Sequence, residues 1–138
     1  MADWNAATIQ EFHSKAGKGV GPFGDQLMLL TTVGARSGEK HITPVMYHRD
    51  GERYVIVASK GGAPDNPAWY RNLKANPLAR VEVGTATGTE KFQVRASEAE
   101  GEERERMFAE RVAIAPGFGE YQRNTSRQIP VMILERTS

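Results

Sequence analysis

Two short segments combine glycine with a basic residue, and this combination suits the binding of an anion. The first is Arg36–Gly38 (Arg-Ser-Gly) and the second is Ser59–Gly62 (Ser-Lys-Gly-Gly). Basic side chains donate charge-assisted hydrogen bonds to phosphate and carboxylate groups, and glycine lets backbone N–H groups approach a ligand closely. The second segment precedes the expected helix start at Asn66-Pro67, where backbone amides also favour an anion. Residue types alone leave two interpretations open: an anion site, or two ordinary polar turns.

Other chemistries find less support in the sequence. The chain has no cysteine, which excludes thiolate nucleophiles and zinc–cysteine or iron–sulfur centres. His41 and His48 are seven residues apart on one expected strand and should point to opposite faces, so we predict no metal site and place both among surface or strand-end polar residues. Residues 98–103 are rich in Glu and precede Arg104, Arg106 and Arg111, an order that the helix dipole favours, so we expect a solvated charged face.

The hydrophobic pattern predicts about six strands, mostly joined by hairpins, and two or three helices. An Asp50-Gly51 hairpin, an N-cap at Asn66 and a capping box at Ser97 and Glu100 mark their boundaries. The expected strands cover residues 27–33, 41–49, 52–59, 78–84, 89–97 and 128–136, and the expected helices cover residues 4–16, 67–76 and 98–115.

This order of elements indicates an α+β fold. Sequential, mainly antiparallel strands argue against a doubly wound sheet, and strands that are apolar on both faces fit a sheet curled into a small barrel under a covering helix. If the first three strands form a meander, both basic turns emerge on the same rim. We expect one domain over residues 1–138, in which residues 1–25 form an N-terminal helix and a glycine-rich lead-in.

Composition limits the partners. Lys and Arg total 18 against 17 Asp and Glu, so the net charge gives no attraction to nucleic acid. No apolar stretch approaches the ~20 residues that cross a bilayer, and the N-terminus has no apolar core of a signal peptide. We expect a cytoplasmic protein, free or peripherally associated with a membrane, that is a monomer or a homodimer.

A series of ordered motifs carries a family resemblance. Thr-Thr-x-Gly ends the first strand and is followed by the Arg-Ser-Gly turn, a proline in the second strand and an Asp-Gly hairpin, then Ala-Ser-x-Gly-Gly and Pro-x-Trp-x-x-Asn-Leu. This series strongly resembles the deazaflavin-dependent nitroreductase family, densely over residues 27–84 and loosely over 116–135. Many members have two adjacent basic residues before Ser-Gly, whereas here Ala35 precedes Arg36, and Met46 stands where members often carry an aromatic residue.

The resemblance implies a split β-barrel of the flavin-oxidoreductase type that binds coenzyme F(420), an 8-hydroxy-5-deazaflavin with a phosphate and an oligoglutamate tail. It also assigns roles by position. Arg36, Ser37, Ser59, Lys60, Gly61 and Gly62 would hold the phosphate and tail; Pro44, Val45, Met46 and Ala58 would line the deazaflavin; Trp69 and Asn72 would close the site.

The function that follows is hydride transfer from the C5 carbon of the reduced deazaflavin to an electron-poor acceptor, such as a quinone, a nitroaromatic compound or an unsaturated lactone or enone. Tyr121 is the candidate for a hydroxyl in the substrate pocket, or alternatively a core tyrosine that covers the barrel. Two other functions stay open: an FMN-binding split-barrel oxidoreductase, and a non-catalytic protein that binds or sequesters the deazaflavin.

Overall fold

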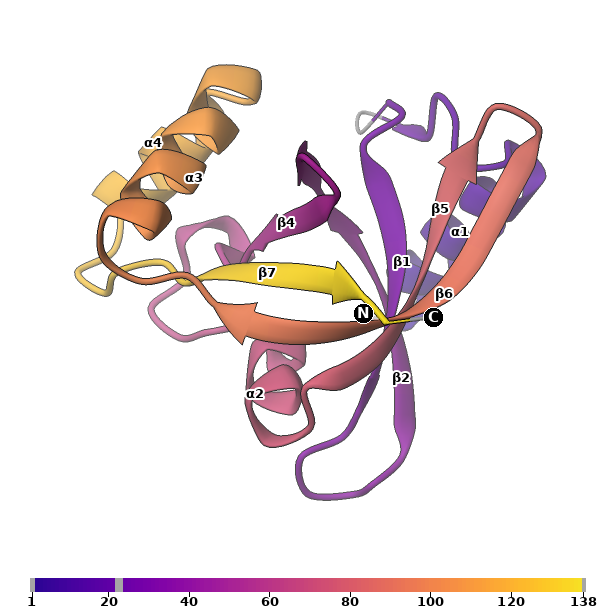
Figure 1. Ribbon diagram of the computed structural model, residues 1–138, viewed down its shortest axis with the longest axis horizontal. Helices are drawn as coiled ribbons and strands as arrows, with labels where there is room; N and C mark the ends of the chain where they lie inside the picture. The colour runs from indigo at the N-terminus through magenta and orange to yellow at the C-terminus, as the bar shows by residue number, and fades with distance from the viewer. Residues whose placement is uncertain (1, 22–23, 138) are drawn as a thin grey trace.

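A single antiparallel sheet of seven strands forms the centre of the computed structural model, which describes residues 2–21 and 24–137 (Figure 1). The order across the sheet is β2-β1-β5-β6-β7-β4-β3, and every neighbouring pair is antiparallel. The strands are β1 (Leu27–Val33), β2 (Lys40–Met46), β3 (His48–Asp50), β4 (Arg53–Val57), β5 (Leu78–Thr85), β6 (Gly88–Glu98) and β7 (Val131–Arg136). The predicted α+β class and antiparallel arrangement are confirmed.

Four α-helices and a short 3-10 helix surround this sheet. They are α1 (Ala2–Ser14), η2 (Lys60–Gly62), α2 (Ala68–Ala75), α3 (Gly101–Ile114) and α4 (Gly117–Arg123). In Figure 1, α3 and α4 lie beyond β4 and β7, whereas α1 lies on the opposite side near β1 and β6. The sequence did not predict α4, because Pro116 and two glycines indicate a chain break; here Pro116 is the N-cap of that helix. Residues 22–23 of the expected lead-in lie outside the described residues.

One expected strand is in fact two. Residues 41–49 were predicted as one strand, but the ladder is interrupted at Tyr47, so that β2 pairs with β1 and β3 pairs with β4. Tyr47 donates its backbone N–H to the carbonyl of Gln26 at 2.9 Å, and its ring packs against that of Tyr54. The change of partner explains why the structure has seven strands where the sequence predicted about six.

Two helix starts differ from their predictions. The helix expected from Pro67 begins at Ala68 with Pro67 as its N-cap, and Asn66 caps nothing because its side chain accepts from Arg127 at 2.7 Å. The capping box at Ser97 is wrong: β6 continues to Glu98, and α3 begins at Gly101 after Glu100. Asn66 is in a tertiary hydrogen bond and Ser97 is in the sheet, so neither residue caps the helix that the local pattern predicted.

Apolar side chains fill both faces of the curled sheet. The largest cluster contains Met28 and Leu30 of β1, Ile56 of β4, and Trp69 and Leu73 of α2. A second cluster lies under α3 and α4, and a third packs α1 against the other face of β1. Leu73 is 1% exposed, and burying such a side chain stabilises the fold by about 1.5–3 kcal/mol. This burial fixes α2 on the sheet.

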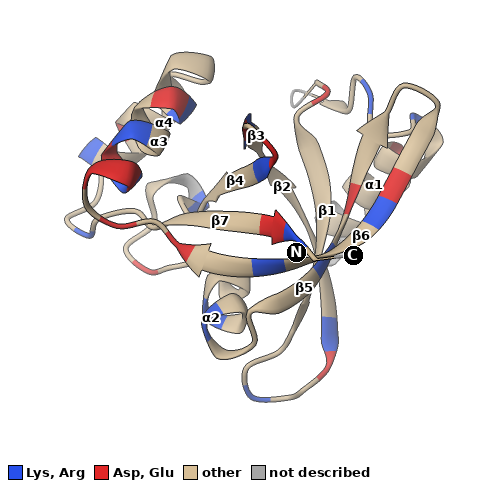
Figure 2. Ribbon diagram, viewed as in Figure 1, with Lys and Arg blue, Asp and Glu red and all other residues tan. Residues whose placement is uncertain are grey.

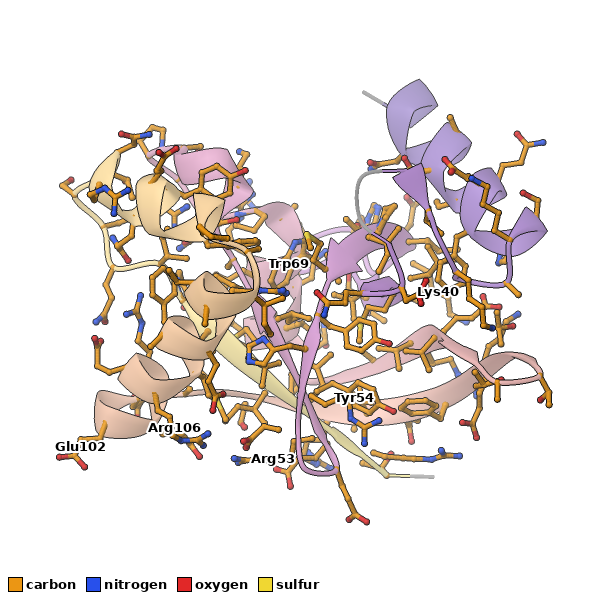
Figure 3. The ribbon with its side chains drawn as sticks, turned by 90° about the horizontal axis from the view of Figure 1, so that it is seen from above. Lys40, Arg53, Tyr54, Trp69, Glu102 and Arg106 are labelled. Atoms are coloured by element: carbon orange, nitrogen blue, oxygen red, sulfur yellow. The ribbon has the colours of Figure 1, made fainter. Side chains whose placement is uncertain are left out.

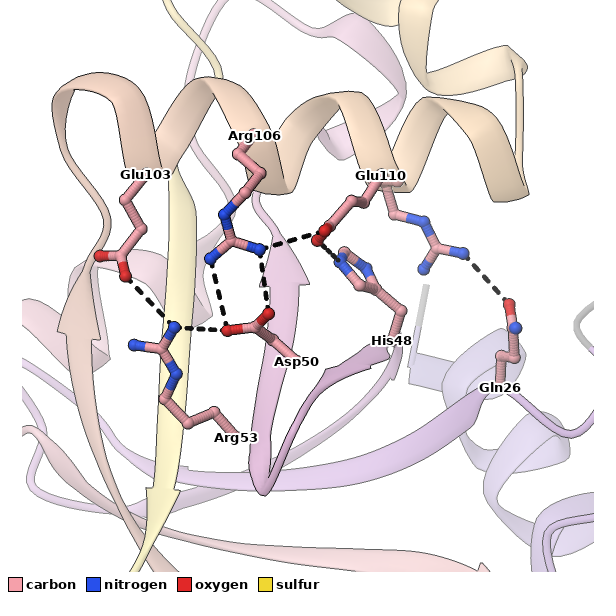
Figure 4. A network of polar contacts seen from close by, with 8 residues as sticks. Gln26, His48, Asp50, Arg53, Glu103, Arg106 and Glu110 are labelled. Carbon is pink, nitrogen blue, oxygen red and sulfur yellow. Dashed lines mark hydrogen bonds and ion pairs between the residues drawn. The ribbon is translucent and has the colours of Figure 1, made fainter.

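The charged face expected of α3 is only partly solvated. Arg104 and Arg111 are buried, and Arg111 donates through Nη2 to Oε1 of Gln26 at 3.1 Å (Figure 4). His48, expected near the surface, is 5% exposed, and its Nε2 lies 3.6 Å from Oε1 of Glu110. The solvated face was therefore wrong for Arg104 and Arg111, and the surface position was wrong for His48, although His48 is a strand-end residue as the alternative allowed. Side chains of α3 contact His48 and Asp50, and a pattern of charges along one helix does not reveal such contacts.

Ion pairs at the solvent edge of the same contact join the β3–β4 hairpin to α3. Asp50 accepts from Arg53 and, at 3.0 Å, from Arg106, while Arg53 also reaches Glu103 at 3.2 Å. Figure 2 marks acidic and basic residues on both the hairpin and the helix, and Figure 4 draws the contacts between them. Hydrogen bonds from Arg106 and Arg53 lower the pKa of Asp50 to about 2. Because the group is near solvent, we expect a modest contribution that is present above pH 3.8 and lost as the pH falls through about 2.

His48 predicts an acid-sensitive stability. Burial and the Arg111 guanidinium hold the pKa of His48 below its usual 6.5, although the carboxylates of Glu110 and Asp50 act in the opposite direction. The unfolded chain therefore takes up a proton near pH 6.5 that the folded chain resists, so the free energy of unfolding should fall as the pH drops from 6.5 through the folded pKa. Urea unfolding between about pH 7.5 and 5 should show this loss, and His48→Gln should reduce it.

The matched control is His41→Gln, because His41 is exposed on β2. Its pH profile of stability should follow that of the unmodified chain. Equal slopes for His48→Gln and the unmodified chain would contradict the assignment.

Candidate functional site

A cavity of about 970 Å³ lies between α2, the β1–β2 turn and β2. A volume of this size is at the upper end of the range for small-molecule sites, roughly 300–1,000 Å³. Its walls come from four places in the sequence that the sheet and its helices bring together. The lining residues are Asn5, Gly34, Ala35, Arg36, Ser37, Lys40, His41, Ile42, Thr43, Asp65, Ala68, Trp69, Arg71 and Asn72.

The β1–β2 turn is a closed loop of backbone hydrogen bonds. Gly34 donates to the carbonyl of Glu39 at 2.7 Å, and Gly38 donates back to the carbonyl of Gly34 at 3.1 Å. The hydroxyl of Ser37 accepts from the N–H of Glu39 at 3.1 Å. A Cβ atom on Gly34 would lie 2.5 Å from that hydroxyl oxygen, so a larger residue there would displace the Ser37 side chain. The turn therefore presents Arg36 outward from a fixed backbone.

Asn72 joins this turn to α2. Its Oδ1 accepts from the backbone N–H of Ala35 at 3.0 Å, and its Nδ2 donates to the hydroxyl of Thr32 at 3.1 Å. Asn72 and Thr32 are both buried, so the bond between them is shielded from water, whereas the bond from Ala35 is part-buried. Asn72 thus positions the residue next to Arg36, in addition to lining the cavity.

The charge of the cavity favours an anion. Among its lining residues, Arg36, Lys40 and Arg71 are cationic and exposed, whereas Asp65 is the one carboxylate. Arg71 is anchored by a bond from its Nη1 to the carbonyl of Asn66 at 2.8 Å. Exposed cations on several elements around one cavity attract a ligand that carries more than one negative charge.

The second basic turn borders the cavity through Asp65. Nζ of Lys60 donates to Oδ2 of Asp65 at 3.0 Å, and this bond lowers the pKa of the carboxyl. Lys60 has a φ of +47°, which is unusual for a residue with a side chain, and Gly62 has a φ of +84°. A Cβ atom on Gly62 would lie 3.0 Å from the carbonyl oxygen of Tyr121, so this glycine allows η2 to pack on α4.

The predicted site residues divide into three groups. Arg36, Ser37, Trp69 and Asn72 line the cavity, and Ser59 to Gly62 border it through the Lys60–Asp65 bond. Trp69 is 7% exposed, so most of its ring belongs to the core (Figure 3). The remaining residues lie outside the lining: Pro44 on β2, Val45 against the main core, Met46 against the α1 cluster, Ala58 fully buried, and Tyr121 half-buried on α4 beside Phe118.

Sequence reasoning missed Lys40, Asp65 and Arg71. Arg71 could have been found, because Ala68, Arg71 and Asn72 have the i, i+3, i+4 spacing of one helix face. No comparable sequence pattern marks Lys40 and Asp65, because their positions at the cavity depend on the paths of two loops.

The amino-acid sequence is similar to those of known reductases. The profile of the F(420)H(2)-dependent quinone reductase family matches residues 4–136. An F(420)H(2)-dependent quinone reductase of Mycobacterium tuberculosis is 39% identical over 112 residues, covering 79% of this chain and 72% of that protein. A second protein of that organism, described as a putative F(420)H(2)-dependent quinone reductase, is 36% identical over 107 residues, covering 78% and 87%.

Solved structures agree with the fold. An F(420)-H(2) dependent reductase (FDR-A) superposes with a TM-score of 0.70 at 44% identity, covering 80% of this chain and 94% of that one. A structure described as a domain-swapped dimer superposes with a TM-score of 0.73 at 39% identity, covering 97% and 98%. The heme protein HutZ of Vibrio cholerae, at 16% identity and a TM-score of 0.63, shares the fold alone.

The curled antiparallel sheet and its covering helices thus define a split-barrel oxidoreductase, as the sequence predicted. The chain belongs to the F(420)H(2)-dependent quinone reductase family. Membership confirms the predicted resemblance to deazaflavin-dependent reductases, the oxidoreductase class and coenzyme F(420) as the cofactor. None of the described helices is long and apolar enough to cross a membrane.

Asn72 provides a test of how the cavity is built. Asn72→Ala removes the part-buried hydrogen bond from the Ala35 N–H and the buried bond to Thr32, and each such bond is worth about 0.5–1.5 kcal/mol. We expect this loss in the free energy of unfolding, measured in urea. Asn72→Asp keeps a carboxylate acceptor for Ala35 and should cost less. Equal stability of Asn72→Ala and the unmodified chain would contradict the role of this bond.

Proposed function

We propose that this chain binds reduced coenzyme F(420) in the cavity beside the β1–β2 turn and uses it to reduce a quinone-type acceptor. The observation that carries the proposal is the meeting of the two basic turns at one cavity, with Arg36 in its wall and Lys60 bonded to its Asp65. The relatives named as quinone reductases support the class of acceptor.

The donors around the cavity fit the chemistry of the cofactor. Its phosphate and oligoglutamate tail are anionic, and Arg36, Lys40 and Arg71 supply three exposed cations near the fixed backbone of the β1–β2 turn. In this proposal Arg36, Ser37 and the Ser59–Gly62 turn hold the phosphate and tail. Pro44, Val45 and Met46, which are partly exposed on β2, and the buried Ala58 remain the proposed residues near the ring.

When bound, coenzyme F(420) supplies the hydride, and the residues of this chain bind, orient and shield. Trp69 and Asn72 fix α2 against the sheet and so hold the cavity in one shape. We propose that Tyr121 offers a hydroxyl on the acceptor side, because α4 packs directly on η2 and so places this residue next to the cofactor turn.

The cofactor is tested by titration of the protein with F(420) and with FMN, followed by fluorescence. We expect the deazaflavin to bind more tightly, and a tighter complex with FMN would contradict the proposal. Catalysis is tested with reduced F(420) and a panel of quinones, enones and nitroaromatic compounds. Acceptor reduction no faster than with free cofactor would favour the function of a non-catalytic deazaflavin-binding protein.

Lys60 and Asp65 should act in opposite directions on cofactor affinity. Lys60→Ala removes a charged donor to the phosphate or tail, which is worth about 1.5–3 kcal/mol, or roughly a 10- to 150-fold rise in Kd. Asp65→Asn removes the carboxylate that now accepts from Lys60, and it should lower Kd. Fluorescence titration measures both, and an unchanged Kd for Lys60→Ala would contradict the proposed site.

A further inference from the structure

Arg127 has no role in the site described so far, although its guanidinium makes four hydrogen bonds to one segment. It lies between α4 and β7, and its side chain reaches back to residues 58–66. Nε donates to the carbonyl of Ala63 at 2.9 Å, and Nη2 donates to the carbonyl of Ser59 at 2.8 Å. Nη1 donates to the carbonyl of Ala58 at 3.3 Å and to Oδ1 of Asn66 at 2.7 Å. These acceptors lie on both sides of the Lys60–Gly62 turn.

The turn depends on outside support. Its own hydrogen bonds are two: Gly62 N–H to the carbonyl of Ser59 at 2.9 Å, and Ala63 N–H to the carbonyl of Lys60 at 3.1 Å. Lys60 is left-handed at φ +47°, a conformation that is strained for a residue with a Cβ atom. A strained three-residue turn persists only when its surroundings determine it. Arg127 supplies that constraint by holding the carbonyls that flank the turn.

Arg127 is itself held in place by a network that begins at α3. Its carbonyl accepts from Nε2 of Gln122 at 2.8 Å. Oε1 of Gln122 accepts from Nη2 of Arg104 and from the N–H of Ile129, each at 3.0 Å. Arg104 is 6% exposed, so the anchor is buried. Gln122 also belongs to α4, which packs on η2 from the other side.

We infer that Arg127 is a positioning residue for cofactor binding, which acts by fixing the geometry of the Lys60 turn. This inference rests on the proposed cofactor site. Arg127 does not line the cavity, and its guanidinium donates to protein atoms. A planar guanidinium suits this task because its N–H groups diverge in a fixed plane, whereas a lysine ammonium offers three donors from one point.

The test compares Arg127→Lys with Arg123→Lys, which changes an exposed arginine four residues away. Both variants keep the net charge. We expect Arg127→Lys to raise the Kd for F(420) about 5- to 20-fold, the effect of losing one or two hydrogen bonds at the turn. Arg123→Lys should leave Kd unchanged. With saturating cofactor, kcat for quinone reduction should stay within about twofold of the unmodified enzyme, because the turn governs binding rather than the transfer step.

A double-mutant cycle separates positioning from general destabilisation. If Arg127 acts through Lys60, then Arg127→Lys should have little further effect on Kd in a chain that already carries Lys60→Ala. Additive effects, or a Kd that follows only the fraction of folded protein seen by circular dichroism, would overturn the inference. A large effect of Lys60→Ala with none of Arg127→Lys would overturn it too, whereas no effect of Lys60→Ala would instead reject the proposed site.

Discussion

The rest of this structure depends on one constraint, which is that a single residue, Tyr47, connects β2 to β3. β2 and β3 are adjacent in the chain, yet they lie at opposite ends of the strand order in the seven-stranded sheet. One residue between them cannot span an open sheet, in which neighbouring strands are about 4.8 Å apart, so the sheet has to curl until its two ends meet. The bond from Tyr47 to the carbonyl of Gln26 and the packing on Tyr54 hold the junction.

Curling gives the two basic turns a common cavity. The Arg36 turn follows β1, and the Lys60 turn follows β4, strands that are separated by three others in the sheet order. α2 then bridges them, since Asn72 bonds the first turn and Asp65, just before the helix, bonds the second. The proposed anion-binding site is therefore a product of closure, and neither turn would form it alone.

Sequence patterns were sufficient for the fold class and for part of the site. The hairpin at Asp50-Gly51, the apolar strands and the motif series located the sheet, the two basic turns and the family. They failed where a residue contacts a partner that is distant in the sequence. Asn66 accepts a hydrogen bond from Arg127, and His48 lies beside Glu110 of α3. Arg127 and Asp65 were also missed, because their roles depend on loop paths and on backbone carbonyls, which carry no signature in residue type.

The bond between Lys60 and Asp65 gives the site its own counter-ion. A carboxylate tethered five residues away is present at an effective concentration on the order of millimolar or more, so a dilute monovalent anion competes poorly for the ammonium group. A ligand with several linked negative charges can meet the other cations of the cavity at the same time and displace the carboxylate. Binding that exchanges one protein carboxylate for a ligand oxygen should also depend less steeply on salt than binding to a bare lysine would. In the proposed site this bond would therefore favour a ligand with several charges over the small anions of its surroundings.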